Sequence, residues 1–271
     1  MTAVNAQRSI IGLRRRWDRQ PEWPVVLDYS HPLSYGFIHP KAFFYLLGQG
    51  NVDATLYSGS NPTNGLVYDV SGNNNNGKQD VGFSGFGQSE QGAGISFTSG
   101  GTRVNTNFLI DSTINGEGTV YWAQQPSTAF NDGNQRFMWG SNTSGSAPEF
   151  TAQKFSDNKL YVGWNGFSGD NRVTIANTAQ WWSTDRVNHW AFTWKSGTKA
   201  RLYNNGLLIG TASSNSNVGA FSGSNTFQIG AVFGTSNAFI GTILYCGLSS
   251  KQHDDGMVYD MAQAPFQMFA K

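Results

Sequence analysis

The sequence predicts an all-β sandwich, and three observations in its 271 residues indicate this fold class. Large aromatic residues alternate with small or polar ones in the segment 187–194, the period-two pattern of a strand with one buried face. Many similar short segments are separated by turn-forming glycine, asparagine, aspartate and serine. No repeat of fixed period is visible, which disfavours solenoids and propellers. We therefore expect two packed antiparallel sheets.

Two successive hairpins are the clearest local prediction. Trp190, Phe192 and Trp194 fall on one face of the first strand, and the residues between them are small or polar. Ser196-Gly197 supplies the first turn. Asn204-Asn205-Gly206 supplies the second, because these residues tolerate positive φ in a tight hairpin loop. We expect the three rings to lie in the core.

Strand patterns continue along the chain, and one helix is expected near its end. The predicted strands are 36–47, 92–98, 118–124, 136–140, 149–155, 159–164, 172–176, 187–194, 200–203, 207–211, 226–230 and 239–248. The helix is expected at about 250–263. Ser249 or Ser250 can cap it, two aspartates favour its first turn, and Pro265 ends it.

Four segments resemble, in sequence order, the laminin-G-like jelly roll of the concanavalin A-like lectin and glucanase superfamily. They are the loop Asp69-Val70-Ser71-Gly72-Asn73, the strand at 94–97, the Arg-Leu-Tyr-Asn-Asn-Gly hairpin at 201–206 and the strand at 239–243. The likeness covers about residues 35–266. It implies a concanavalin A-like jelly roll sandwich of two antiparallel sheets.

The first 34 residues differ from the rest, so we expect an extended N-terminal arm at 1–34 and the jelly roll domain, with its C-terminal helix, at 35–271. The arm carries five arginines against one aspartate up to residue 19. One interpretation is a disordered tail, and the other is a clamp on a neighbouring subunit, because the segment is too apolar for a solvated tail. The expected arm contacts are Arg14, Arg15, Arg16, Trp17 and Trp23.

Composition limits the classes of partner. Charged residues make up 13% of the chain and the net charge is +1, so no global field steers it to nucleic acid. No apolar run is long enough to span a membrane, and the N-terminus lacks a signal peptide's apolar core. We expect a soluble product made in the cytoplasm, with no membrane partner. Cys246 is the single cysteine, and its apolar surroundings predict a buried thiol.

Catalytic motifs are missing, so we expect no enzyme, no catalytic residues and no cofactor. Glucanases that share this fold need two positioned carboxylates, but none of the four glutamates lies within five residues of another. Gln228-Ile229 is followed by Gly230 where the related lyases place a histidine. The four histidines are isolated and offer no zinc-ligand spacing. His253, beside two aspartates, is expected to serve a helix start.

Calcium is the one metal hypothesis, because the resemblance implies a Ca²⁺ at the loop rim held by Asp, Asn and carbonyl oxygens. Asp69, Asn73 and Asn75 form the first candidate site. Asp132 with Asn131 and Asn134 forms the second. The competing interpretation of both is turn formation.

Exposed aromatic rings are the candidates for glycan or partner contact, because sugars stack on such rings. The candidates are Trp139, Trp164 and the adjacent pair Trp181 and Trp182. The competing interpretation places these rings in the core, where we also expect Trp122, Trp190 and Trp194.

Both ends of the sequence resemble laminin-G-like proteins of tailed phages, with Arg14 to Pro21 matching their arm and His31 standing where they have asparagine. The leading hypothesis is a non-enzymatic virion protein, a capsid decoration or cement protein that clamps capsid or tail subunits and forms a homo-oligomer. The first alternative is a tail fibre or appendage adhesin that binds host glycan. The second is a polysaccharide-degrading enzyme.

Overall fold

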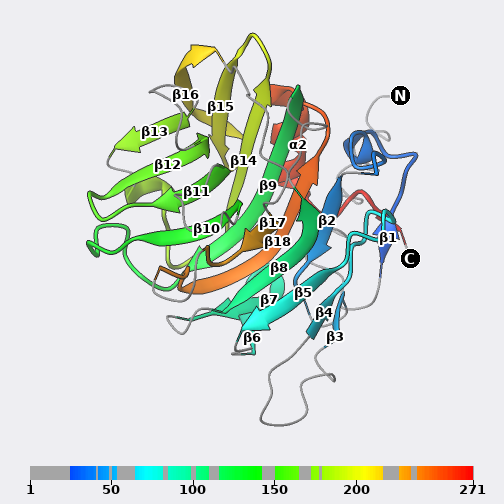
Figure 1. Cartoon of the computed structure of the whole chain (residues 1–271), viewed down its shortest axis with the longest axis horizontal. Coiled ribbons are helices and arrows are strands. Elements are labelled where there is room, and N and C mark those ends of the chain that lie inside the picture. Colours follow the sequence, from blue (N-terminus) through cyan, green and yellow to red (C-terminus); the bar gives the residue numbers. More distant parts are fainter. Residues whose placement is uncertain are drawn as a thin grey trace, which may run out of the picture.

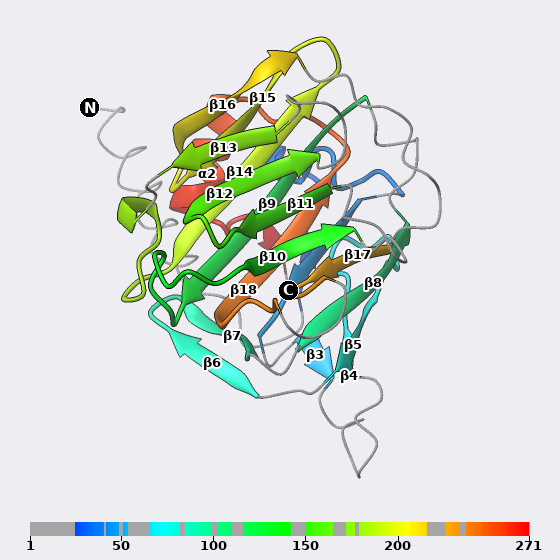
Figure 2. The same ribbon diagram turned by 60° about the vertical axis from the view of Figure 1, so that its left-hand side comes forward.

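Two antiparallel sheets stack face to face in the computed structural model of the chain (Figures 1 and 2). The structure describes residues 25–40, 42–48, 51–53, 65–81, 85–98, 102–109, 116–141, 150–164, 172–176, 179–215, 226–232 and 237–270. The predicted fold class is confirmed: the chain is a β-sandwich with one described α-helix near its C-terminus.

The first sheet has nine strands in the order β13-β12-β11-β10-β17-β8-β5-β4-β3. Their bounds are β3 Val52–Asp53, β4 Gly65–Val67, β5 Gly77–Val81, β8 Arg103–Leu109, β10 Arg136–Ser141, β11 Phe150–Lys154, β12 Lys159–Trp164, β13 Arg172–Ala176 and β17 Thr226–Ile229. Figure 2 shows these strands lying across those of the second sheet.

The second sheet runs in the order β16-β15-β14-β9-β18-β7-β6, with β2 also paired to β18. Its strands are β2 Phe43–Leu46, β6 Phe86–Ser89, β7 Gly92–Phe97, β9 Glu117–Pro126, β14 Asn188–Lys195, β15 Lys199–Asn204, β16 Leu207–Asn215 and β18 Gly241–Ser249. A separate ribbon pairs β1 (Val26–Leu27) with β19 (Phe269–Ala270). The helical elements are η1 Pro32–Ser34, η4 Ala179–Trp181 and α2 Asp255–Gln263.

Both predicted hairpin turns are confirmed. Gly197, between β14 and β15, has a φ of 80°. Asn205 and Gly206, between β15 and β16, have φ values of 49° and 82°, the left-handed pair that a two-residue hairpin turn requires. These turns place β14 to β16 side by side, with the polar face of β14 on the outside of the sandwich.

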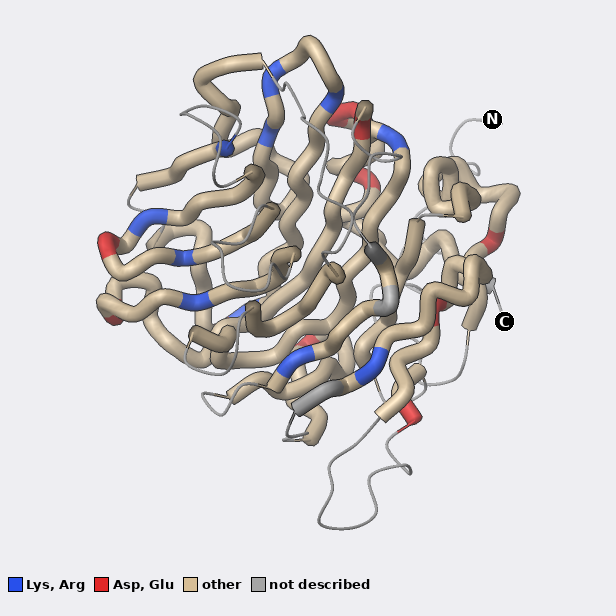
Figure 3. Tube along the Cα trace, viewed as in Figure 1, with Lys and Arg blue, Asp and Glu red and all other residues tan. Residues whose placement is uncertain are grey.

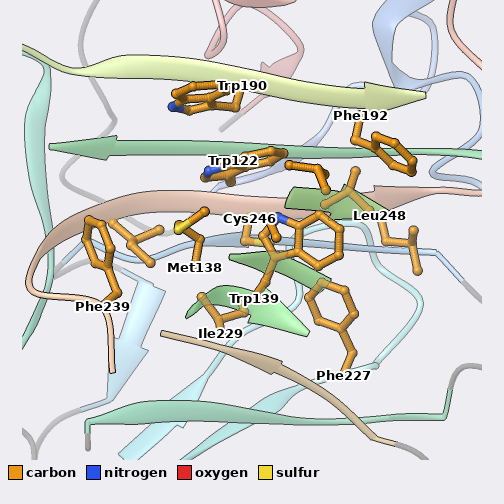
Figure 4. Packing of buried hydrophobic residues seen from close by; sticks show 14 of the residues in the cluster. Trp122, Met138, Trp139, Trp190, Phe192, Phe227, Ile229, Phe239, Cys246 and Leu248 are labelled. Atoms are coloured by element: carbon orange, nitrogen blue, oxygen red, sulfur yellow. The ribbon is translucent and has the colours of Figure 1, made fainter. Parts of the chain in front are cut away.

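The main core lies between the two sheets, and tryptophans dominate it. Trp122 on β9 stacks on Trp190 with ring centroids 5.7 Å apart and meets Trp139 edge to face at 5.6 Å (Figure 4). Phe192 and Trp194 belong to the same cluster, as predicted from their alternation with small residues. The thiol of Cys246 is fully buried, as expected, and burial raises its pKa well above the usual value.

A third layer covers the outer face of the second sheet. It consists of the segment before β2, helix α2 and the C-terminal tail (Figure 1). Side chains that alternate with the main-core residues point into this layer, among them Tyr121, Ala191 and Tyr203. Because Val25, Leu27 and Leu33 are buried there and β1 pairs with β19, residues 25–34 belong to the fold. The prediction that assigned them to the arm is wrong.

Several boundaries differ from the prediction, and two of the differences have a local cause. Of the strand expected at 36–47, only Phe43–Leu46 forms, because Gly36 has a φ of 92° and opens a turn. The helix begins at Asp255 rather than at 250, since Asp254 is its N-cap and accepts a hydrogen bond from the Met257 amide at 2.8 Å. The serines at 249 and 250 therefore do not cap it.

Charged residues are sparse and of mixed sign over the described chain (Figure 3). Within the described residues, no helix has the length and apolar character needed to cross a membrane.

Candidate functional site

The predicted glycan contacts Trp139, Trp164 and Trp182 are core residues. Their exposed fractions are 0%, 5% and 4%. Trp164 stacks on Phe150, and the Trp182 indole donates a hydrogen bond to the Thr128 carbonyl at 2.9 Å. Buried rings have no free face for a sugar, so the expectation of exposed rings is wrong at these three positions.

Trp181 is the half-buried member of the pair. It ends η4 and packs against the main core at its edge. Its carbonyl accepts a 3.5 Å hydrogen bond from the Asn204 amide. Contact between Trp181 and a glycan stays a prediction.

The first calcium candidate is a hydrogen-bonded loop. The Asp69 carboxylate, which is 8% exposed, accepts backbone N–H bonds from Phe44 at 2.9 Å and from Ser71 and Asn75 at 3.0 Å. The Asn73 amide donates to carbonyls of the preceding turn, including that of Phe37 at 2.7 Å. Because both carboxylate oxygens face N–H groups rather than a cation, these contacts contradict the prediction of calcium at Asp69, Asn73 and Asn75.

Asp69→Asn is expected to lower the free energy of unfolding by about 2 to 4 kcal/mol, because an amide cannot accept all three N–H bonds and its NH₂ group faces a donor. Thermal unfolding followed by circular dichroism measures this loss. In the same experiment, excess Ca²⁺ or a chelator should leave the wild-type Tm unchanged. A rise of the Tm with Ca²⁺ that Asp69→Asn abolishes would restore the calcium hypothesis.

At the second calcium candidate, the Asp132 carboxylate is already paired with positively charged side chains of the protein. Asp132 pairs with the buried Lys154 ammonium and with Arg136 at 3.1 Å. Burial raises the pKa of Asp132, but hydrogen bonds from Lys154 and Asn134 outweigh it and hold the pKa below its usual value. Lys154 also donates to the Asn134 carbonyl at 2.8 Å. The ammonium thus occupies the position a metal would need, and this site too is structural.

His253 is a buried structural residue, as expected of a residue near a helix start. Its Nε2 lies 2.9 Å from the Tyr35 carbonyl, which can only accept, so Nε2 carries the proton. Nδ1 then accepts from the Tyr121 hydroxyl at 2.7 Å. Burial lowers the pKa of His253 to about 4. This neutral imidazole ties the segment before α2 to the N-terminal segment.

An apolar surface near the N-terminus is the strongest candidate for interaction. Five of the nine exposed large apolar side chains in the described residues belong to it, and we call it the N-terminal surface. Its members are Val26, Tyr29, Tyr35, Ile38 and Tyr68, which are 42% to 60% exposed. Four of them lie within residues 26–38, where Asp28 is the single residue with a formal charge at pH 7 when histidine is neutral. A segment that exposes several large apolar side chains is a candidate for protein–protein contact.

Buried neighbours hold the backbone of this surface. Leu27 donates to the Val70 carbonyl at 3.0 Å, and Asp28 donates to that of Met268 at 2.7 Å. The Tyr29 hydroxyl bonds the Ser71 carbonyl. Gly36 accepts from the amide of Ser250 at 3.0 Å. The surface is therefore ordered before any partner binds, which limits the entropy lost on association.

This surface was not predicted, because residues 25–34 were expected to belong to the arm. The expected arm contacts Arg14, Arg15, Arg16, Trp17 and Trp23 lie outside the described residues. The sequence did contain one indication of an exposed apolar residue here. Residues 25–27 are all apolar, and in an extended chain the middle side chain points to the opposite side from the other two. Val26 is that residue, 54% exposed between two buried ones.

Comparisons with known proteins show the fold alone. No family model matches the chain, and no curated protein matches its sequence. Among solved structures, the receptor binding domain of botulinum neurotoxin D is similar, with a TM-score of 0.57 and 12% identity over 84% of this chain. The same toxin domain in complex with N-acetylneuraminic acid gives a TM-score of 0.56.

Trypanosoma rangeli sialidase in complex with sialic acid is also similar, with a TM-score of 0.55 and 11% identity over 98% of this chain. The match spans 54% of the toxin domain and 39% of the sialidase. These β-sandwich neighbours agree with the expected jelly roll. At such identities they carry no residue roles to this chain.

Proposed function

We propose that this chain is a non-enzymatic structural protein of a tailed-phage particle, a capsid decoration or cement protein that docks through the N-terminal surface. The observation that carries the proposal is the pre-ordered apolar surface immediately after the arm. The side chains of this surface are about half exposed, so covering three of them contributes about 1 kcal/mol each, to which contacts of the arm would add. The resemblance of both sequence ends to laminin-G-like proteins of tailed phages supports a capsid or tail subunit as the partner.

The surroundings of Glu117 favour a structural role over catalysis for this carboxylate. Glu117 pairs with Lys251 at 2.8 Å and with Lys195 at 3.8 Å. Burial raises the pKa of Glu117, but the hydrogen bond and charge of Lys251, the charge of Lys195 and a backbone hydrogen bond from Gln252 together outweigh burial and lower the pKa. A carboxylate held ionised in this way is a poor general acid. Glu22 and Glu149 lie outside the described residues.

An adhesin that binds host glycan is the second candidate function. It is favoured by the structural neighbours, which are a receptor binding domain and proteins in complex with sialic acid. We propose it after the structural role because a sandwich fold is shared by proteins of many functions.

The triple variant Val26→Ser, Tyr35→Ser, Ile38→Ser tests the docking proposal. These side chains are exposed, so we expect the free energy of unfolding to change by about 0.5 kcal/mol or less at each position. Incorporation into particles, measured as chain copies per capsid subunit after gradient purification, should fall. The matched control is Phe155→Ser with Leu207→Ser, two exposed apolar residues elsewhere. Removing residues 1–24 measures the contribution of the arm separately.

A further inference from the structure

Residues of β14, β15 and β16 and of the turn that leads into α2 line a polar groove. Figure 1 shows where these three neighbouring strands and α2 lie. The volume of the groove is about 550 Å³. Thr193, Arg201 and Thr211 lie in register across the three strands and belong to its lining. Gln252 and Asp254 line the helix side. We call this hollow the strand-end groove.

Thr193 is the residue in the groove that points to a ligand. Its side chain is fully buried, and its hydroxyl has no hydrogen-bond partner among the described residues. The neighbouring Thr119 faces it across the β14–β9 pair. The Thr119 hydroxyl, by contrast, donates to the Lys251 carbonyl at 2.8 Å and accepts from the His253 amide at 2.9 Å. An unpaired buried hydroxyl destabilises a fold, so its retention favours a partner that arrives from outside.

Other polar groups around the groove are available to the same partner. Within the described part of the chain, no hydrogen bond is made by the Thr211, Asn215 or Gln252 side chains, and no ion pair by Lys199. Hydroxyls and amides both donate and accept, which suits a molecule covered in hydroxyl groups.

The charged residues of the groove indicate which charge a ligand should carry. Arg201 is held by Asp255 at 2.9 Å, and Asp255 also accepts from the Tyr203 hydroxyl at 2.6 Å. Asp254 is used as the α2 cap. Lys199 is thus the groove cation that has no carboxylate partner in the described structure, and it suits an acidic group on the ligand. Lys199 and Arg201 stand against Asp254 and Asp255, so the formal charges around the groove sum to zero and a polyanion such as nucleic acid is not favoured.

We propose that the strand-end groove binds a saccharide carrying an acidic group, with Thr193 at its base and Lys199 at the acid. The groove adjoins the N-terminal segment at His253, but Thr193 and Lys199 are not members of the N-terminal surface, and the proposal does not depend on the position of the chain in a particle. Leu208 is the one aliphatic residue that lines it, so a peptide side chain finds no apolar pocket.

The test uses the full chain on an array of neutral, sialylated and sulfated saccharides, followed by calorimetry with the strongest binder. Thr193→Val keeps the shape and removes the hydroxyl. We expect it to raise the Kd roughly fivefold to tenfold, the effect of one hydrogen bond. Its Tm should stay level or rise, because an unpaired hydroxyl is replaced by a methyl group. Lys199→Ala should weaken acidic saccharides and leave any neutral one unchanged.

Two controls separate binding from stability. Thr119→Val makes the same change one strand away and should lower the Tm, since that hydroxyl is paired. Thr174→Val, at an exposed position of the other sheet, should change neither the Tm nor the Kd. Absence of wild-type binding to every acidic saccharide on the array would overturn the proposal, as would unchanged affinity in both Thr193→Val and Lys199→Ala.

Discussion

Trp139→Ala is expected to lower the free energy of unfolding by about 3 to 5 kcal/mol, a large part of the stability of a single domain. The indole is fully buried and touches three other rings. It stacks on Phe227 at 5.4 Å, tilts against Phe150 at 4.8 Å and meets Trp122 edge to face at 5.6 Å. Truncation leaves a cavity between the two sheets that these rings cannot fill.

Chemical denaturation monitored by fluorescence measures the loss. Trp181→Ala is the matched control, because that ring is half-buried at the core edge and should cost roughly 1 kcal/mol. Equal losses in the two variants would contradict the assignment of Trp139 to the core and Trp181 to its edge.

The second large effect is a loss of stability in mild acid. Burial lowers the pKa of both His189 and His253 to about 4. The same imidazoles titrate near 6.5 in the unfolded chain, so the unfolded state binds more protons between these values. The contribution of the two neutral imidazoles to the free energy of unfolding is therefore fully present above about pH 6.5 and is lost as the pH falls towards 4. At pH 5 the loss is about 2 kcal/mol for each imidazole.

The pH window distinguishes histidines from acids. The pKa values of Glu117 and Asp132 are lowered, so these carboxylates lose their contribution only as the pH falls through still lower values. Unfolding free energies measured at pH 7, 6 and 5 therefore report mainly on imidazoles, with a smaller part from the half-buried His31, whose pKa burial also lowers. The double variant His189→Gln, His253→Gln should flatten the profile. An unchanged slope would contradict the burial of the two rings.

The hairpins were predictable because both their signals are local. Alternation assigned Trp190, Phe192 and Trp194 to the core, and Asn205-Gly206 supplied the left-handed turn. Strand β8 was missed although Val104 and Phe108 point inward in alternation, because asparagines and a threonine between them resemble a loop. Its strand state follows from pairing with β5 and β17, which the sequence does not reveal.

The candidate sites were less predictable, because each depends on tertiary packing. Composition cannot say which tryptophan lies between the sheets, and so the three buried rings were indistinguishable from surface ones. The polar face of β14 was visible in the sequence, but the missing partner of Thr193 appears only when Thr119 is seen to hold the neighbouring bonds. The N-terminal surface required the knowledge that Leu27 and Leu33 anchor that segment.

The number of chain copies per particle in the N-terminal surface variant tests the central claim most directly. Particles produced with Val26→Ser, Tyr35→Ser, Ile38→Ser should carry about tenfold fewer copies than wild-type particles, or fewer still, since each tenfold corresponds to about 1.4 kcal/mol and three apolar contacts are lost. The Phe155→Ser, Leu207→Ser control should be incorporated fully. Full incorporation of the triple variant, or no wild-type chain on purified particles, would contradict the account.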